Sequence, residues 1–418
     1  MAGAEVVAGL WAAEEVISTG IQASVAGYAI AKPTMPLNAT FSQIGSTSDT
    51  QSTASLARSH HTLTVIGNRA WIFGGQTAEK QLATDEIHSI ALPINGTSET
   101  EYQALPSIPV SDGQQTPAAR SEHAACAIGK RLAIHGGRSE DGALVDEGSK
   151  IWIFDTEQLT WEALEPASHP ERTPPARYKG RLLSHGGNLV LYGGVGSDGS
   201  ALTDVWHFDC STKVWNQLPH APVAAASAAV SGDTLYVIAA SDSLSSDVHS
   251  LDIKLYETQP PTWSTVSVPT NPLTPGPQPR ENGGLLPVTT GFGRNFLLYF
   301  FGERQADIKN DAKVSTDLWT YQLPSSELQA KMSTEAVKPA KVKDQIRSGL
   351  GADTGESSWA EVEVQAPGDP QAQSGKAHPG PRGSFGYDVS QDGKNVVIWG
   401  GTSGDGKVEG DGWMITLS

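Results

Sequence analysis

Residues 177–194 read Arg-Tyr-Lys-Gly-Arg-Leu-Leu-Ser-His-Gly-Gly-Asn-Leu-Val-Leu-Tyr-Gly-Gly. After a turn-rich segment come Asp-Val-Trp-His-Phe-Asp at 204–209 and Val-Trp-Asn-Gln-Leu at 214–218. Four short runs of Leu, β-branched and aromatic residues are thus separated by Gly, Asp and Ser, which predicts four consecutive antiparallel strands. One such sheet buries too little apolar surface to be stable alone, so the unit should repeat along the chain.

Three patterns from this stretch do recur. The Gly-Gly pair ends the second run at 74–75, 136–137, 193–194 and 400–401, with degenerate copies at 238–240 and 300–302. An acidic residue shortly before Trp or His marks the third run at 85–88, 204–206, 247–249, 317–319 and 411–413, with a variant at 148–152. An aromatic residue with an aliphatic one three positions later marks the fourth run at 102–105, 161–164, 215–218, 263–266 and 359–362. After Gly74 there are therefore six copies of the first three runs and five of the fourth.

The missing fourth run lies near the start of the sequence. Phe41-Ser-Gln-Ile44 has the aromatic-x-x-aliphatic pattern, whereas Trp413-Met-Ile-Thr-Leu417 is a third run with no fourth run after it. Pairing 41–46 with 413–417 would complete the sixth unit and close a ring, which leaves only short, protected strand edges. We therefore expect an all-β, six-bladed β-propeller over residues 41–418.

The Gly-Gly, Asp-x-Trp and Trp-x-x-Leu patterns resemble those of the kelch-repeat family, and the resemblance covers about residues 41–418. It implies a kelch-type propeller, a fold that hosts both binding proteins and enzymes. Apolar residues at helical spacing over 4–31 predict a short helix within an N-terminal extension, residues 1–40. Residues 325–357 form a long insertion with several Lys residues between strands three and four of blade five.

The formal net charge is −17, from 46 acidic and 29 basic residues. A basic footprint is required to bind a phosphate backbone or an anionic membrane, so we expect neither nucleic acid nor membrane as a partner. The first residues lack the basic and continuous apolar regions of a secretory signal, and Cys126 and Cys210 fall in different layers of adjacent blades. The sequence thus predicts a cytoplasmic protein with two free thiols.

Candidate binding residues come from the loops that propeller topology gathers around one end of the central axis. An Arg precedes the first strand of every blade except the fourth, and His follows three residues later in blades one and two; Arg138 directly follows a Gly-Gly pair. The candidates are Arg58, His61, Arg120, His123, Arg138, Arg177, Arg280 and Arg382. They form either a basic collar for an anionic peptide or small metabolite, or structural bonds between neighbouring loops, as in kelch-like blades.

A candidate metal site follows the degenerate glycine pair of blade five. Glu303, Asp307 and Asp311 recur at four-residue spacing and could converge on a divalent cation. The pattern resembles the Glu-x-x-x-Asp-x-x-x-His iron-binding motif of the plant specifier proteins, with Asp311 in place of the His. Mg²⁺ or Fe²⁺ would suit such a set, although pairing with Arg304 or Lys309, or a solvated loop, explains the same spacing.

Two functions follow from these expectations. The first is a recognition protein that binds a protein or a small anionic ligand on the Arg-bearing face. The alternative is a metal-assisted lyase or isomerase that resembles the specifier proteins and acts on a small anionic substrate. The sequence does not decide whether the protein is an enzyme.

Overall fold

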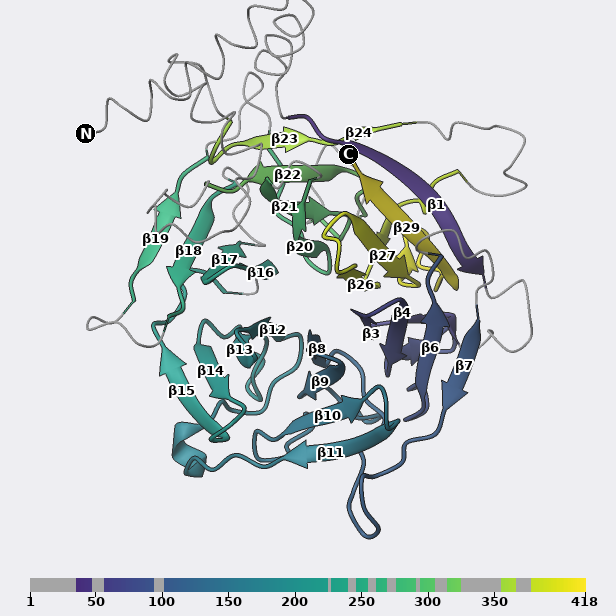
Figure 1. The fold of residues 1–418 in the computed structure, drawn as a ribbon, viewed down its shortest axis with the longest axis vertical. Coiled ribbons are helices and arrows are strands. Elements are labelled where there is room, and N and C mark those ends of the chain that lie inside the picture. The colour runs from purple at the N-terminus through teal and green to yellow at the C-terminus, as the bar shows by residue number, and fades with distance from the viewer. Residues whose placement is uncertain are drawn as a thin grey trace, which may run out of the picture.

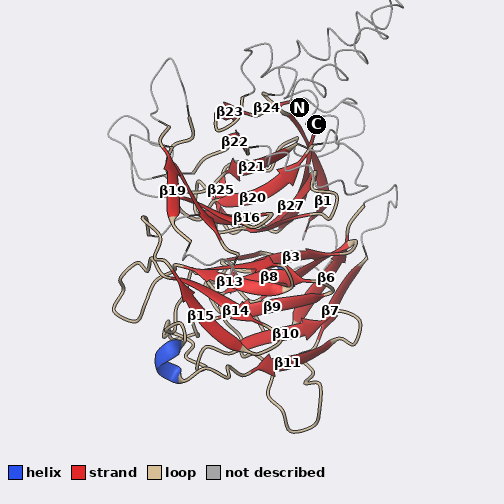
Figure 2. Cartoon of the chain, turned by 60° about the vertical axis from the view of Figure 1, so that its left-hand side comes forward, coloured by secondary structure: helices blue, strands red, loops and turns tan. Residues whose placement is uncertain are grey.

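The computed structural model describes residues 35–46, 56–93, 101–224, 227–239, 246–254, 261–268, 276–290, 294–304, 314–324, 355–365 and 377–418. These residues form six mainly antiparallel blades arranged radially around a central axis, together with two short two-stranded ladders (Figure 1). The expected six-bladed propeller is confirmed. Figure 2 shows the blades from a tilted direction, with the 3-10 helix η2 (Pro170–Arg172) at the rim.

In each of blades one to five, four antiparallel strands lie side by side in the order in which they occur along the chain. Blade one contains β3 (Thr62–Ile66), β4 (Arg69–Phe73), β6 (Ile87–Ala91) and β7 (Tyr102–Leu105). Blade two contains β8 (Ala124–Ile128), β9 (Arg131–His135), β10 (Ile151–Asp155) and β11 (Thr160–Leu164). Blade three contains β12 (Arg181–His185), β13 (Asn188–Tyr192), β14 (Val205–Asp209) and β15 (Val214–Leu218).

The second half of the ring follows the same plan. Blade four contains β16 (Ser227–Ser231), β17 (Thr234–Ile238), β18 (Val248–Asp252) and β19 (Trp263–Val266). Blade five contains β20 (Gly284–Thr289), β21 (Asn295–Phe300), β22 (Leu318–Gln322) and β23 (Trp359–Glu361). Blade six contains β26 (Gly386–Val389), β27 (Asn395–Trp399), β29 (Asp411–Leu417) and, from the start of the chain, β1 (Asn38–Ser46).

The ring is closed by a strand from near the start of the sequence that pairs with the last strand. Strand β1 pairs antiparallel with β29, with Phe41 opposite Ile415 and Gln43 opposite Trp413. The predicted pairing of 41–46 with 413–417 is therefore confirmed, and it extends to Asn38. A second contact was not predicted: β24 (Glu363–Val364) pairs parallel with the other edge of β1. The outer edge of blade six is therefore partly covered by chain that continues from blade five.

The hydrophobic core lies between neighbouring blades. Middle strands such as β13 are buried on both faces by the neighbouring blades, and nearly all of their residues are therefore apolar. Aromatic side chains cross the gaps between blades: the ring centroids of Phe73 in blade one and Trp161 in blade two are 5.3 Å apart. Every blade thus contributes to two interblade cores.

Short ladders tie the loops together at one end of the axis. In five blades the residue after the repeated Arg pairs with the residue after the Gly-Gly position. The pairs are Ser59 with Gln76, Ser121 with Arg138, Tyr178 with Val195, Glu281 with Glu303, and Gly383 with Thr402. The first and last belong to the two-stranded ladders β2 (Arg58–Ser59) with β5 (Gln76–Thr77) and β25 (Arg382–Gly383) with β28 (Thr402–Ser403).

Several expectations fall partly outside the described residues. The predicted helix over 4–31 and all but the last three residues of the 325–357 insertion lie there. Both cysteines are free, and they are half-buried rather than fully buried. Within the described residues, no helix has the length and apolar character needed to span a membrane.

Candidate functional site: the channel mouth

The five repeated arginines are almost completely buried inside the blades, with exposed fractions of 0–1%. Each guanidinium donates to the carbonyl of the first residue of its own blade's Gly-Gly position, at 2.9–3.1 Å. The acceptors, in blade order, are Gly74, Gly136, Gly193, Phe301 and Gly400. The repeated Arg therefore fixes the turn that ends the second strand of its blade.

In four blades the same guanidinium also binds the acidic residue that precedes the Trp of the third strand. Arg177 donates to both carboxylate oxygens of Asp204 at 2.7 Å, and the indole Nε1 of Trp206 donates to the same carboxylate at 2.6 Å. The equivalent sets are Arg120, Glu147 and Trp152; Arg280, Asp317 and Trp319; and Arg382, Asp411 and Trp413. Three sequence patterns thus converge on one buried network in each of these blades.

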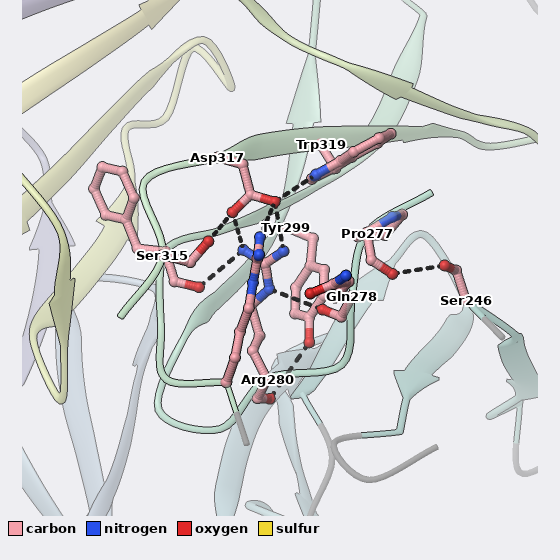
Figure 3. Close-up of polar contacts among 10 residues, drawn as sticks. Ser246, Pro277, Gln278, Arg280, Tyr299, Ser315, Asp317 and Trp319 are labelled. Carbon is pink, nitrogen blue, oxygen red and sulfur yellow. Dashed lines mark hydrogen bonds and ion pairs between the residues drawn. The ribbon is translucent and has the colours of Figure 1, made fainter. Parts of the chain in front are cut away.

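Figure 3 shows this network in blade five. Arg280 lies between the Asp317 carboxylate and the ring of Tyr299, whose centroid is 4.6 Å from the guanidinium carbon. Burial alone would raise the pKa of Asp317, but the charge and hydrogen bonds of Arg280 outweigh burial and hold that pKa well below its usual value. Asp317 also accepts hydrogen bonds from Ser315 and Arg304.

In blade one a neutral histidine, His88, stands at the position of the third-strand Trp and contacts the Arg. An Nη2 atom of Arg58 lies 2.9 Å from Nε2 of His88, and Nδ1 of His88 lies 2.9 Å from the hydroxyl of Tyr102. Arg58 can only donate, so Nε2 accepts and the proton resides on Nδ1. Burial first, and the charge of Arg58 second, lower the pKa of His88 to about 3. Burial also lowers the pKa of Arg58 to about 10.

This geometry supports the structural alternative for the five arginines. Their donors face carbonyls, carboxylates or His88 inside the blades, so they do not form the basic collar that the sequence suggested. His61 and His123 are also buried, each about 5% exposed. Nε2 of His123 lies 2.7 Å from the Thr62 hydroxyl of the preceding blade, and burial lowers the pKa of His123 to about 3. Both histidines thus pack between blades.

The channel mouth is formed instead by the residue two positions after each Arg. The five residues are His60, Glu122, Lys179, Asn282 and Ser384. Each has a left-handed backbone, with φ between 51° and 57°, although none is glycine. Such a conformation is uncommon for non-glycine residues and is retained where surrounding structure fixes it. It is fixed here by hydrogen bonds between blades.

These interblade bonds run around the mouth. The backbone N–H of Glu122 donates to the carbonyl of His60 at 2.9 Å, and that of Lys179 donates to the carbonyl of Glu122 at 2.7 Å. His60 donates to Ser384 at 2.8 Å, and Ser384 donates to Asn282 at 3.1 Å. We call these five residues the mouth ring. The backbone hydrogen bonds between these residues fix the positions of their side chains around the opening of the channel.

Charges are unevenly distributed around the mouth. The Glu122 carboxylate lies 3.6 Å from Nζ of Lys179, 3.7 Å from Nε of Arg138 and 3.8 Å from Nε2 of His60. The Arg138 guanidinium also stacks on the Tyr178 ring, 3.6 Å from its centroid. Lys179 and Arg138 each keep about 37% of the side chain exposed. We call Arg138, Lys179, Glu122 and Tyr178 the basic side of the mouth.

The opposite side, in blade five, is acidic. Glu281 is exposed and its backbone pairs with that of Glu303. The Oε1 atom of Glu303 accepts a hydrogen bond from the Asn282 amide at 3.2 Å and lies 3.5 Å from the Ser384 hydroxyl. Glu303 therefore faces the mouth ring.

The predicted metal site can be placed only in part. Asp307 and Asp311 lie outside the described residues. Among the residues that are described, no three His, Cys, Asp or Glu side chains are arranged to hold a metal ion. The contacts of Glu303 with Asn282 and Ser384 are those of a hydrogen-bonded mouth residue, and the metal-assisted alternative stays a prediction.

Below the mouth ring lies a cavity of about 670 Å³ along the axis. The first strands of all six blades line it. Its wall includes small residues of blades two and four, such as Ala125 and Ala228, and larger apolar residues of blades five and six, such as Leu286 and Val389. A cavity of this size can enclose a small molecule or the side chains of a bound peptide.

Comparisons with known proteins agree with this architecture. Residues 39–238 match the family model described as the KLHDC2/KLHL20/DRC7 Kelch-repeats domain. Acyl-CoA-binding domain-containing protein 4 of Arabidopsis thaliana is 24% identical over 274 residues, which cover 63% of this chain and 38% of that protein. Rab9 effector protein with kelch motifs of Homo sapiens is 28% identical over 132 residues, 31% of each chain.

A solved structure shows the same fold. The structure of YjhT aligns with a TM-score of 0.54 and 13% identity, covering 86% of this chain and 97% of that one. The matched part of the chain spans less than two fifths of the length of the two curated relatives. The six blades, the repeated Gly-Gly and Asp-x-Trp networks and the family-model match over residues 39–238 show a β-propeller that carries kelch repeats.

Sequence reasoning identified Arg138 but missed its neighbours at the mouth. Glu122 and Lys179 occupy one position in the repeat, two residues after the Arg, where five described blades carry five different residues. A position whose backbone is constant and whose side chain varies between blades is where a propeller can acquire specificity. That variation was visible in the aligned repeats.

Proposed function

We propose that this propeller is a recognition module that binds an acidic segment of a protein partner at its channel mouth. Kelch-motif relatives support a protein-binding role in general. The observation that carries the finer proposal is the basic side of the mouth. There, two partly exposed cations flank one carboxylate at distances of 3.6 and 3.7 Å, beyond ordinary hydrogen-bond length.

This spacing leaves donors available for a ligand. About 37% of each cationic side chain stays exposed to a ligand, and Nε of Arg138, which is buried beside Glu122, makes no hydrogen bond to a described residue. Stacking on Tyr178 restricts the orientation of the guanidinium, which reduces the entropy lost when its fork binds a carboxylate. Glu122 keeps the two cations close together, and a second carboxylate would bridge them.

The acidic side of the mouth determines the orientation of the segment. Glu281 and Glu303 would repel a carboxylate from blade five, so the acidic residues of the partner would lie over blades two and three. Electrostatic attraction at an exposed mouth is screened by salt, and binding should therefore weaken as ionic strength rises.

The test compares two fluorescein-labelled octapeptides, one of glutamate and one of glutamine, by fluorescence anisotropy. We expect the wild-type protein to prefer the glutamate peptide, and the Arg138→Met/Lys179→Met variant to bind it at least tenfold more weakly. That estimate assumes roughly 1.5–3 kcal/mol for each hydrogen bond to a charged group. Arg131→Met is the matched control, because Arg131 follows a hairpin at the other end of the axis and is 43% exposed.

Equal affinity for the two peptides would contradict the proposal, and so would an equal loss in the Arg131→Met control. A loss confined to Arg138→Met/Lys179→Met that disappears at high salt would support it.

A further inference from the structure

At one position of the first strand, five blades carry a small residue and the remaining blade carries an arginine. It is the residue of the first strand that pairs with the residue just before the Gly-Gly position. In blade order these residues are Thr62, Ala124, Arg181, Ser227, Gly284 and Gly386. Five of the six have no side chain or a very small one, whereas blade three places an arginine there.

Space explains the small residues in other blades. A Cβ atom on Gly284 would lie 2.3 Å from the Phe300 ring, and one on Gly386 would lie 2.6 Å from Nε2 of His61. Thr62 fits because its hydroxyl bonds His123. In these blades the space beside the first strand is therefore filled by protein.

In blade three the space is open enough for a long side chain. Arg181 is half-buried and lines the central cavity. Across from it, blade four contributes Ser227 and Ala228 to the wall, which are too small to fill the space. Tyr192, the strand partner of Arg181, turns its hydroxyl to the carbonyl of Val223 at 2.7 Å.

The Arg181 guanidinium has no partner within the described part of the chain. Its Nε atom is buried without a hydrogen bond, and neither an ion pair nor a hydrogen bond to its Nη atoms is present there. A buried donor on a charged group that lacks a partner costs about 1–3 kcal/mol or more. Each of the five structural arginines, by contrast, is bonded to protein acceptors.

The acid on the channel wall does not supply that partner. Asp388 accepts hydrogen bonds from the backbone N–H groups of Val65 and Val389, both at 2.8 Å. Burial raises its pKa to about 6, so its negative charge is disfavoured in the channel. At the mouth, Glu122 is shared by Lys179 and Arg138.

We propose that Arg181 anchors an internal site for a small organic anion, a carboxylate or phosphate monoester with an apolar body. The anionic group would accept hydrogen bonds from the guanidinium fork. The apolar body would lie against the wall formed by Leu286, Pro287 and Val389. This site differs from the mouth in its ligand and in its anchoring residue, which lies two positions further along the chain into the channel than Lys179.

The test measures binding of three small probes by isothermal titration calorimetry. The probes are 3-phenylpropionate, phenyl phosphate and the neutral 3-phenylpropionamide. Wild-type protein should bind at least one anion tenfold or more tightly than the amide, and the two anions together show whether the site prefers a carboxylate or a phosphate. Arg181→Met should weaken anion binding at least tenfold and leave the amide unchanged.

Two further variants locate the site. Arg181→Lys keeps the charge but loses the fork, so it should retain part of the anion affinity and serves if Arg181→Met does not fold. Lys179→Met should leave anion binding within about twofold, because Lys179 belongs to the mouth. The glutamate octapeptide should bind Arg181→Met as it binds wild type, which separates this site from the proposed function.

Three results would overturn the inference. The first is wild-type protein that binds the amide as tightly as both anions. The second is Arg181→Met or Arg181→Lys with unchanged anion affinity. The third is an equal loss in Lys179→Met, which would move the anion to the mouth.

Discussion

Replacing Asp204 with Asn tests the buried network that each Arg forms with its third strand. Arg177 and Asp204 are both buried and share two hydrogen bonds of 2.7 Å. Burial alone would raise the pKa of Asp204, but the hydrogen bonds and charge of Arg177 hold that pKa below its usual value. The carboxylate is therefore ionised at neutral pH, and Asp204→Asn removes its charge with little change in shape.

The expected loss in free energy of unfolding is about 3–5 kcal/mol, the range for breaking a buried ion pair by removing one partner. Two terms contribute. Arg177 keeps the Gly193 carbonyl at 2.9 Å but loses the charge that compensates its burial. The new amide also presents donors to Arg177 or Trp206 where the carboxylate presented only acceptors.

The measurement is urea unfolding at pH 7, followed by tryptophan fluorescence. Asp233→Asn is the control, because its ion pair with Lys254 is about half exposed and such pairs are worth about 0–1 kcal/mol. The difference between wild type and Asp204→Asn should shrink as pH falls from the usual pKa of an Asp through the lower pKa of folded Asp204, because the wild-type carboxylate is then protonated and loses its charge as well. A loss at pH 7 no larger than that of Asp233→Asn would refute the role assigned to the network.

Three further predictions concern closure, pH and the Gly-Gly turn. Thr40 and Thr416 are opposite each other on β1 and β29, so the oxidised Thr40→Cys/Thr416→Cys variant should carry an intramolecular disulfide and gain about 2–4 kcal/mol; unchanged melting of an oxidised sample would count against the closure. The pKa of His88 is about 3 in the folded protein, below that of an unfolded His, so its contribution to stability is complete above pH 6.5 and is lost as pH falls; at pH 5.5 the loss is about 1.4 kcal/mol. His88→Gln should remove that part of the pH dependence of urea unfolding, and an unchanged slope would contradict the neutral His88. Gly75 has a φ of 94°, and a Cβ there would lie 2.6 Å from the Ser59 carbonyl oxygen, so Gly75→Ala should lower the melting temperature more than Gly67→Ala, where nothing lies within 4 Å; equal effects would show that the contact can relax.

The ring architecture was predictable because the repeated residues are ones that the backbone of each blade requires, such as glycines with positive φ at the end of the second strand. A Gly-Gly pair, degenerate in blades four and five, and an aromatic residue on each outer strand recur at one position per blade, and Phe41 with Trp413 showed where the ring closes. The role of the arginines was harder to infer. Their partners lie 27 residues away in blades two and three, at Glu147 and Asp204, and a constant spacing indicates a contact only once the blade geometry is known.

The binding residues were less predictable for the opposite reason. Mouth-ring residues share a backbone conformation but no residue type, so Glu122 and Lys179 follow no motif. Arg181 stands out only when the six first strands are aligned by their pairing with the Gly-Gly position. Whether a repeated charge faces solvent or protein depends on packing between blades, which a single repeat does not contain.

The join between β1 and β29 also affects how the chain is made. Strand β1 leaves the ribosome before any other described strand, whereas its partners β29 and β24 are synthesised after all of blades one to four. Throughout that interval β1 has unpaired backbone groups on both sides, the condition that favours pairing with foreign strands. The sixth blade can therefore assemble only after β29 has been synthesised, and products truncated before β29 would keep the β1 edge unpaired on that side.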